Sequence, residues 1–194
     1  LVTKKTVEEY YDIPGFINSN SEFIEVVNEC FASILEHYKV TLPSPYLLTR
    51  SMWLREITGK VYEGRKELGQ DVIELLKNEI RHLVEEGVKI IQIDEPILSE
   101  VVFTNEKADN SFYWGALSEK VKVDKELKFA RELLDPVLEE IRKHDGVLSI
   151  MHVCRGNWTT DESVLLQGAY DKLGKFFDAL DLDMLALEFS TPRA

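Results

Sequence analysis

Four short apolar runs, separated by segments with helical spacing, are the feature that most constrains the fold of this chain. Between the runs, apolar residues recur at the three- and four-residue spacing of amphipathic helices. Strands that alternate regularly with helices form a parallel sheet with right-handed crossovers. We therefore expect an α/β fold, either a (β/α)₈ TIM barrel or a doubly wound sheet. The predicted strands are Val40–Leu42 continuing towards Leu48, Val88–Asp94, Val147–Cys154 and Met184–Phe189.

Apolar stripes predict the helices. Gly87 would end the helix before the second strand, and Asp124 would cap the next one. Pro136 should kink the helix that begins at Asp124. Thr160 and Asp161 would begin the last helix. The stripes run over Phe23–Ile34, Leu68–Val84, Leu127–Ile141 and Val164–Leu180, and a long connection without an assigned helix runs from Ser99 to Val123.

Polar residues lie where three of the predicted strands end. Asp94 ends the second strand, His152 and Cys154 end the third, and Glu188 lies at the end of the fourth. The carboxyl ends of parallel strands meet at one edge, which is where α/β proteins place their chemistry. Polar residues that face inward at strand ends favour the barrel. With about four visible strands, the chain would be roughly half to two thirds of a barrel of ~250 residues.

Composition limits the classes of function. Lys and Arg total 23 against 35 Asp and Glu, for a net charge of −12. This balance disfavours nucleic acids and anionic membranes as partners, and no apolar stretch approaches the ~20 residues of a membrane span. The only cysteines are Cys30 and Cys154, too few for a disulfide framework. We therefore expect a cytoplasmic protein.

His152 and Cys154 predict a metal site. Residues two apart on a strand point to the same face, so an imidazole and a thiolate would be aimed at one point. That donor pair suits Zn²⁺ better than Mg²⁺ or Ca²⁺, which prefer oxygen ligands. Taken singly, the residues also fit a buried Cys beside a hydrogen-bonded His, and Asp94 or Glu188 would fit an ordinary strand terminus. Their joint placement favours the metal.

Three motifs together resemble the catalytic barrel of cobalamin-independent methionine synthases, and most closely the short members that consist of that barrel alone. The motifs are Ile91-Gln92-Ile93-Asp94-Glu95-Pro96, His152-Val153-Cys154-Arg155-Gly156-Asn157 and Leu185-Ala186-Leu187-Glu188. The resemblance implies methionine biosynthesis by a methyltransferase, in which zinc holds the thiol of homocysteine and a methylated folate donates the methyl group.

The same resemblance implies roles for single residues. His152, Cys154 and Glu188 would be zinc ligands, and Asp94 would bind the amino group of homocysteine. Glu100 would contact the folate, and Trp53 would stack on it. No catalytic residue is expected beyond the metal site.

The chain departs from the family pattern in several places. No cysteine follows Cys154 to serve as the family's fourth ligand. The residues that hold homocysteine from earlier strands, and a His acid after the last aligned strand, have no match either. Because the chain opens on Leu1 and stops soon after a strand, we expect residues 1–194 to be one partial barrel domain truncated at both ends.

Two other functions remain open. A related barrel methyltransferase could use a corrinoid or another methyl donor. Alternatively, the chain could be a non-catalytic relic that keeps the fold and a metal. Porphyrin decarboxylases share the layout, but they do not need the thiolate-bound metal that His152 and Cys154 suggest.

Overall fold

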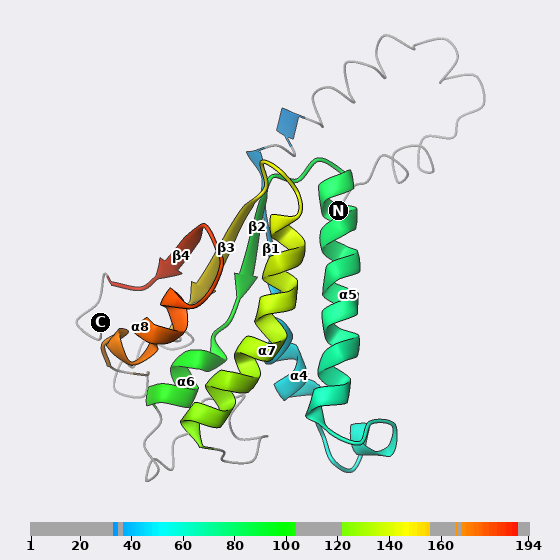
Figure 1. The fold of residues 1–194 in the computed structure, drawn as a ribbon, viewed down its shortest axis with the longest axis vertical. Coiled ribbons are helices and arrows are strands. Elements are labelled where there is room, and N and C mark those ends of the chain that lie inside the picture. The colour runs from blue at the N-terminus through cyan, green and yellow to red at the C-terminus, as the bar shows by residue number, and fades with distance from the viewer. Residues whose placement is uncertain (1–32, 35–36, 104–121, 156–165, 167, 190–194) are drawn as a thin grey trace.

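The computed structural model describes residues 33–34, 37–103, 122–155, 166 and 168–189 (Figure 1). These residues form one parallel sheet and the helices that connect its strands. In chain order the elements are β1 (Lys39–Pro43), α4 (Pro45–Met52), the 3₁₀ helix η1 (Thr58–Lys60), α5 (Arg65–Glu85), β2 (Ile90–Asp94), α6 (Ile97–Phe103), α7 (Val123–Arg142), β3 (Leu148–Val153), α8 (Asp171–Asp178) and β4 (Met184–Leu187).

All four described strands are parallel and lie in the order β1-β2-β3-β4. In the register, Pro43 pairs with Asp94, and Asp94 pairs with His152. The carboxyl ends of β1, β2 and β3 therefore lie at the same edge. This confirms the predicted parallel α/β sheet.

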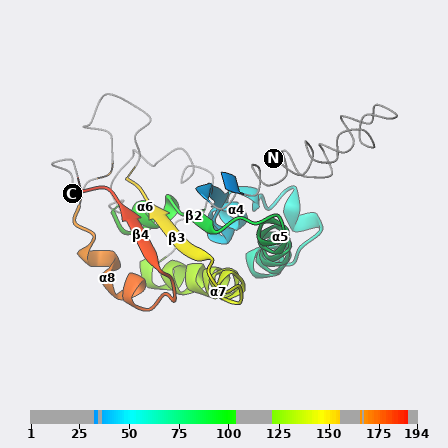
Figure 2. The ribbon, with the colours of Figure 1, turned by 90° about the horizontal axis from the view of Figure 1, so that it is seen from above.

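The long crossover helices cover only one face of the sheet. Figure 2 shows α5, α7 and α8 on the same side of the strands. A doubly wound sheet has helices on both faces and reverses its strand order at a switch point. A (β/α)₈ barrel keeps strands in sequence order and has helices only outside. The observed arrangement is that of a partial barrel, with the face opposite the helices corresponding to the barrel interior.

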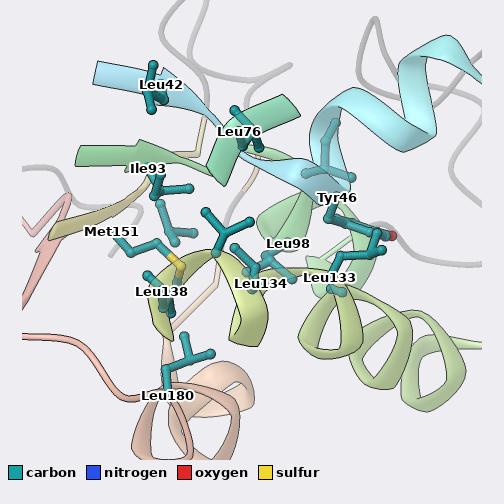
Figure 3. Packing of buried hydrophobic residues seen from close by; sticks show 14 of the residues in the cluster. Leu42, Tyr46, Leu76, Ile93, Leu98, Leu133, Leu134, Leu138, Met151 and Leu180 are labelled. Carbon is teal, nitrogen blue, oxygen red and sulfur yellow. The ribbon is translucent and has the colours of Figure 1, made fainter. Parts of the chain in front are cut away.

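Alternation along the strands separates the two faces chemically. Ile91 and Ile93 of β2 and Met151 of β3 are fully buried against the helices. Leucines of α5 and α7 close over them, as Figure 3 shows for Leu76, Leu134 and Leu138. The intervening residues Gln92, Asp94 and His152 lie on the opposite face.

Helices α5 and α7 pack at close range through a glycine. A Cβ added to Gly69 of α5 would lie 2.6 Å from Cδ2 of Leu133 in α7. Near this contact, the buried Glu126 carboxylate accepts hydrogen bonds from the Tyr46 hydroxyl (2.7 Å) and the Arg65 guanidinium (2.6 and 3.1 Å). Although burial raises its pKa, these hydrogen bonds hold the pKa of Glu126 below its ordinary value. The cluster ties α4, α5 and α7 together.

Several predicted boundaries were wrong. The N-cap residue of α7 is Lys122. Asp124 lies in the first turn, where its carboxylate interacts favourably with the positive end of the helix dipole. The helix continues through Pro136, where the expected kink stays a prediction. Leu75, predicted in the buried stripe of α5, is exposed.

The connection that starts at Ser99 is partly helical, because α6 includes residues 97–103. Helix α8 begins at Asp171, and Ala169 precedes it as non-helical chain. The predicted helix start at Thr160 and Asp161, and most of the stripe over residues 23–34, lie outside the described residues.

None of the helices in the described part of the chain combines the length and apolarity needed to cross a bilayer.

Candidate functional site

Asp94 and His152 meet at the carboxyl edge of the sheet. They are paired in the register of β2 and β3, and Asp94 Oδ1 lies 3.1 Å from His152 Nδ1. Their side chains are about one third exposed, at 36% for Asp94 and 32% for His152. The sequence therefore placed these two residues together correctly, on the face opposite the described helices α5, α7 and α8.

A hydrogen-bonded chain continues from Asp94 along the same face. Gln92 Nε2 donates to Asp94 Oδ1 at 2.6 Å, and Lys39 Nζ donates to Gln92 Oε1 at 2.7 Å. Gln92 is 7% exposed. Neither Gln92 nor Lys39 had a predicted role, because residue spacing does not encode contacts between strands or side-chain rotamers.

Cys154 and Glu188 lie beyond the ends of β3 and β4. Glu188 Oε2 accepts a hydrogen bond from the backbone N–H of Arg155 at 3.1 Å, so this carboxylate lies beside the chain that carries Cys154. Cys154 is half-buried, and its carbonyl accepts a hydrogen bond from the Ser99 hydroxyl. Both residues are therefore at the edge where the sequence placed them.

The side chains of the expected ligand set do not converge. Among the described residues, no group of three or more His, Cys, Asp and Glu side chains is arranged to hold a metal ion. The donor types of His152, Cys154 and Glu188 nevertheless suit zinc. Their backbone positions also suit it, because β3 and β4 are adjacent and His152 pairs with Ala186. Zinc binding by these residues stays a prediction.

Glu95 is a structural residue of the site that the sequence analysis missed. It is completely buried, and its carboxylate accepts hydrogen bonds from the Ser44 hydroxyl and from the N–H of Ile97 (2.9 Å). Its own N–H donates to the carbonyl of His152 at 2.8 Å, and Ser44 N–H donates to that of Asp94 at 2.9 Å. Glu95 thus connects the ends of β1, β2 and β3 to the start of α6. The sequence signal was only an acid between a strand and a proline, which is typical of any strand terminus.

Glu100 and Trp53, the expected folate contacts, lie on two different helical segments. Glu100 of α6 is 4% exposed, and its Oε2 has no hydrogen-bond partner in the described part of the chain. Burial raises the pKa of Glu100 to about 7, although the charge of Arg50 acts in the opposite direction. Trp53 follows α4 and packs, half-buried, against the core. Among the described residues, the hydrogen bonds of the Asp94 side chain go to Gln92 and His152 and not to either of these two.

Arg155 also had no predicted role. It is 1% exposed, and its guanidinium lies 4.0 Å from the centroid of the Tyr170 ring and 5.7 Å from that of Phe103. The Tyr170 hydroxyl donates to the Val153 carbonyl at 2.7 Å. These contacts attach the end of β3 to the ends of α6 and α8 that lie beside it.

A family model described as the catalytic domain of cobalamin-independent synthase matches residues 60–128. The match includes Asp94 and Glu100 and ends before His152.

Curated relatives extend the similarity. A methionine synthase of Sulfurisphaera tokodaii is 27% identical over 184 residues, which are 92% of this chain and 41% of that protein. A methionine synthase of Saccharolobus solfataricus is 34% identical over 90 residues, which are 46% of this chain and 24% of that protein. The chain thus spans less than half the length of these relatives. A Listeria monocytogenes crystal structure described as a vitamin-B12-independent methionine synthase matches 83% of this chain and 51% of its own, with 15% identity and a TM-score of 0.46.

Proposed function

We propose, from the similarity of this chain to cobalamin-independent methionine synthases, that it takes part in zinc-dependent methyl transfer from a methylated folate to the thiol of homocysteine. The observation that carries the proposal is the pairing of Asp94 with His152 on adjacent strands, at the edge where parallel sheets bind ligands.

In this proposal Asp94 binds the substrate ammonium. Oδ1 of Asp94 is occupied by Gln92 and His152, whereas Oδ2 has no hydrogen-bond partner among the described residues. The Asp94 side chain is about one third exposed, and a carboxylate oxygen without a partner is suited to a charge-assisted hydrogen bond from an ammonium group. Asp94 would thereby hold the amino acid beside the metal ligands.

His152, Cys154 and Glu188 would hold the zinc ion. A bound Zn²⁺ deprotonates a coordinated thiol, whose unperturbed pKa of about 8.5 makes it a weak nucleophile at neutral pH. Three protein ligands leave the fourth position for the substrate thiol, as in other catalytic zinc sites.

Glu100 and Trp53 are the proposed folate contacts. A pKa raised to about 7 leaves a large share of the Glu100 carboxyl protonated near neutral pH. A protonated carboxyl can donate as well as accept a hydrogen bond, which suits the mixed donors and acceptors of a pterin ring. Trp53 would supply an aromatic face.

Substitution of Cys154 tests the metal assignment. We expect Cys154→Ser to lower zinc bound at equilibrium, because a hydroxyl is a poorer zinc ligand than a thiolate. Cys30→Ser is the matched control and should retain zinc, since Cys30 lies in a segment that the sequence predicts as an apolar helical stripe. Equilibrium dialysis followed by metal analysis measures both variants. Equal zinc in the two variants would contradict the assignment of Cys154.

Two substitutions of Asp94 distinguish its two proposed roles, binding of the ammonium group and hydrogen bonding to Gln92 and His152. Asp94→Asn keeps an oxygen that can accept from Gln92 and His152 but removes the charge facing the ligand. We expect homocysteine to bind about ten- to a hundred-fold more weakly, as for the loss of a charged hydrogen bond of about 1.5–3 kcal/mol, while zinc is retained. Asp94→Ala removes both functions and should also weaken zinc binding by about 10–100-fold.

Titration calorimetry with homocysteine and dialysis with zinc distinguish these outcomes. If Asp94→Asn binds homocysteine as tightly as the unchanged chain, Asp94 is not the ammonium ligand. If it loses zinc stoichiometrically, Asp94 is instead a metal ligand. Zinc binding without any homocysteine binding in the unchanged chain would favour the metal-binding relic.

A further inference from the structure

We propose that Lys39 and Gln92 are positioning residues of the candidate site, which hold Asp94 and the ring of His152 in one hydrogen-bonding arrangement. The proposal rests on the proposed function for its purpose, but its geometry stands on three hydrogen bonds that run from β1 across β2 to β3.

The partners of Gln92 allow only one orientation of its amide. The Lys39 ammonium can only donate a hydrogen bond, so the atom facing it at 2.7 Å must be the amide oxygen. The Asp94 carboxylate can only accept, so the atom facing it at 2.6 Å must be the amide nitrogen. An amide between a cation and an anion therefore cannot flip without losing both hydrogen bonds.

The fixed amide selects which oxygen of Asp94 is available. Gln92 Nε2 and His152 Nδ1 both contact Oδ1 of Asp94. Rotation of the carboxylate would break two contacts at once. Oδ2 therefore stays as the oxygen that faces a ligand, in an orientation set before the ligand arrives.

The same arrangement fixes the proton on His152. Asp94 Oδ1 is an acceptor that already receives a hydrogen from Gln92, so the contact with His152 Nδ1 at 3.1 Å requires the proton to lie on Nδ1. The lone pair of the neutral ring is then on Nε2. Metal-binding histidines use this arrangement: Nδ1–H donates to a carboxylate, and the unprotonated Nε2 is available to the metal.

Core packing does not explain these polar residues. Gln92 lies on the face opposite the buried Ile91 and Ile93, and Lys39 is exposed. A methionine would fill the place of either side chain with similar length and no need for partners. Lys and Gln side chains also lose more rotamer freedom on ordering than most residues. The placement of Lys39 and Gln92 therefore indicates that they orient Asp94 and do not merely fill space.

The state of the His152 ring tests the proposal without any assay of activity. Two-bond ¹H–¹⁵N correlation spectra of the full 194-residue chain, recorded where histidine is neutral, report which ring nitrogen carries the proton. We expect the Nδ1–H tautomer in the unchanged chain. In Gln92→Met, we expect the Nε2–H tautomer, which an unconstrained side chain prefers, to gain population, and zinc affinity to fall by about ten-fold.

Lys39 variants provide a graded second measurement. Lys39→Met should produce a smaller change than Gln92→Met, because the Asp94 carboxylate alone still selects the N–H side of the amide. Lys39→Arg keeps a cationic donor and should restore the spectrum of the unchanged chain. This pair also decides the matter if Gln92→Met fails to fold, since Lys39 is an exposed side chain.

Gln70→Met and Lys60→Met are the matched controls, because both residues are exposed and lie away from the strands. If Gln92→Met and Lys39→Met leave the His152 tautomer and zinc affinity the same as these controls do, the proposal is wrong. A chain that shows the expected tautomer changes but binds no homocysteine supports the positioning role and contradicts the proposed function instead.

Discussion

Two buried carboxyl groups, Glu95 and Glu100, lie close in sequence to the candidate site, and burial raises the pKa of each to about 7. They differ in their surroundings. Glu95 accepts hydrogen bonds from Ser44 and Ile97, which oppose the effect of burial. In contrast, Glu100 Oε2 has no hydrogen-bond partner among the described residues. Only the charge of Arg50 opposes the increase of the Glu100 pKa by burial. Glu100 is therefore the simpler group in which to measure the effect of burial.

Glu100→Gln should change how stability depends on pH. A pKa raised from 4.5 to about 7 in the folded state means that the folded chain binds a proton which the unfolded chain releases between these values. Stability should then fall as the pH rises from about 4.5 to about 7. The amide does not ionise, so Glu100→Gln should reduce this decline.

Thermal unfolding at pH 5 and pH 7.5 measures the effect. The difference in stability between Glu100→Gln and the unchanged chain should be more favourable to the variant at pH 7.5 than at pH 5. Glu85→Gln, at an exposed position of α5, is the control and should give the same difference at both pH values. A Glu100→Gln variant that behaves like Glu85→Gln would show that Glu100 titrates normally.

Residue types and strand positions could predict Asp94 and His152 because both follow from period-two alternation. The roles of Gln92, Lys39 and Glu95 could not be predicted, since each depends on a partner at least 50 positions away in the sequence. Side-chain orientation also decides whether His152, Cys154 and Glu188 converge, and strand spacing carries no information about it.

At the scale of elements, helix packing depends on where small residues allow close approach. Gly69 permits the contact of α5 with α7, whereas the space around Gly174 of α8 is open, with no atom within 4 Å of an added Cβ. Both glycines lie inside helices and neither has a positive φ. They therefore form a matched pair that separates packing from helix propensity.

Gly69→Ala should destabilise the chain by about 1–3 kcal/mol, because the added methyl overlaps Leu133 in a filled core. Gly174→Ala should stabilise it by about 0.5–1 kcal/mol, because alanine loses less backbone freedom in a helix. Urea unfolding of both variants measures the two changes. Equal stabilisation by both substitutions would mean that α5 and α7 adjust to the added methyl group without cost.

The clear hydrophobic periodicities predicted β2, β3, α5 and α7 well. The less regular sequence patterns around α6 and α8 did not predict those helices correctly. The predicted stripe over Val164–Leu180 was wrong at Gly168 and Ala169, which are not helical, because apolar residues continue at helical spacing before Asp171. Helix α6 was missed because its first turn is capped from outside by the Glu95 carboxylate, which accepts from Ile97 N–H. Such capping is invisible to a search for Ser, Thr, Asp or Asn in the cap position.

At the scale of the whole molecule, the long helices that the structure describes, α5, α7 and α8, all lie on one face of the sheet. The covered face accounts for the core, and the other face carries the polar chain from Lys39 to His152. Leu148 and Met184 on that face are 46% and 52% exposed. Asp94 and His152 thus lie on the face that corresponds to the interior of a barrel.

The order β1-β2-β3-β4 has a consequence for the rates at which the backbone opens. Strands β2 and β3 are hydrogen-bonded to neighbours on both sides, whereas β1 and β4 each have one neighbour in the described sheet. In hydrogen–deuterium exchange, we expect the amides of Ile91, Ile93 and Met151 to exchange most slowly and those of β4 to exchange early. Faster exchange in β2 than in β4 would contradict this order. Asp94 and His152 therefore belong to the strands that should open last, so local fluctuations that free the ends of the sheet would leave their spacing intact.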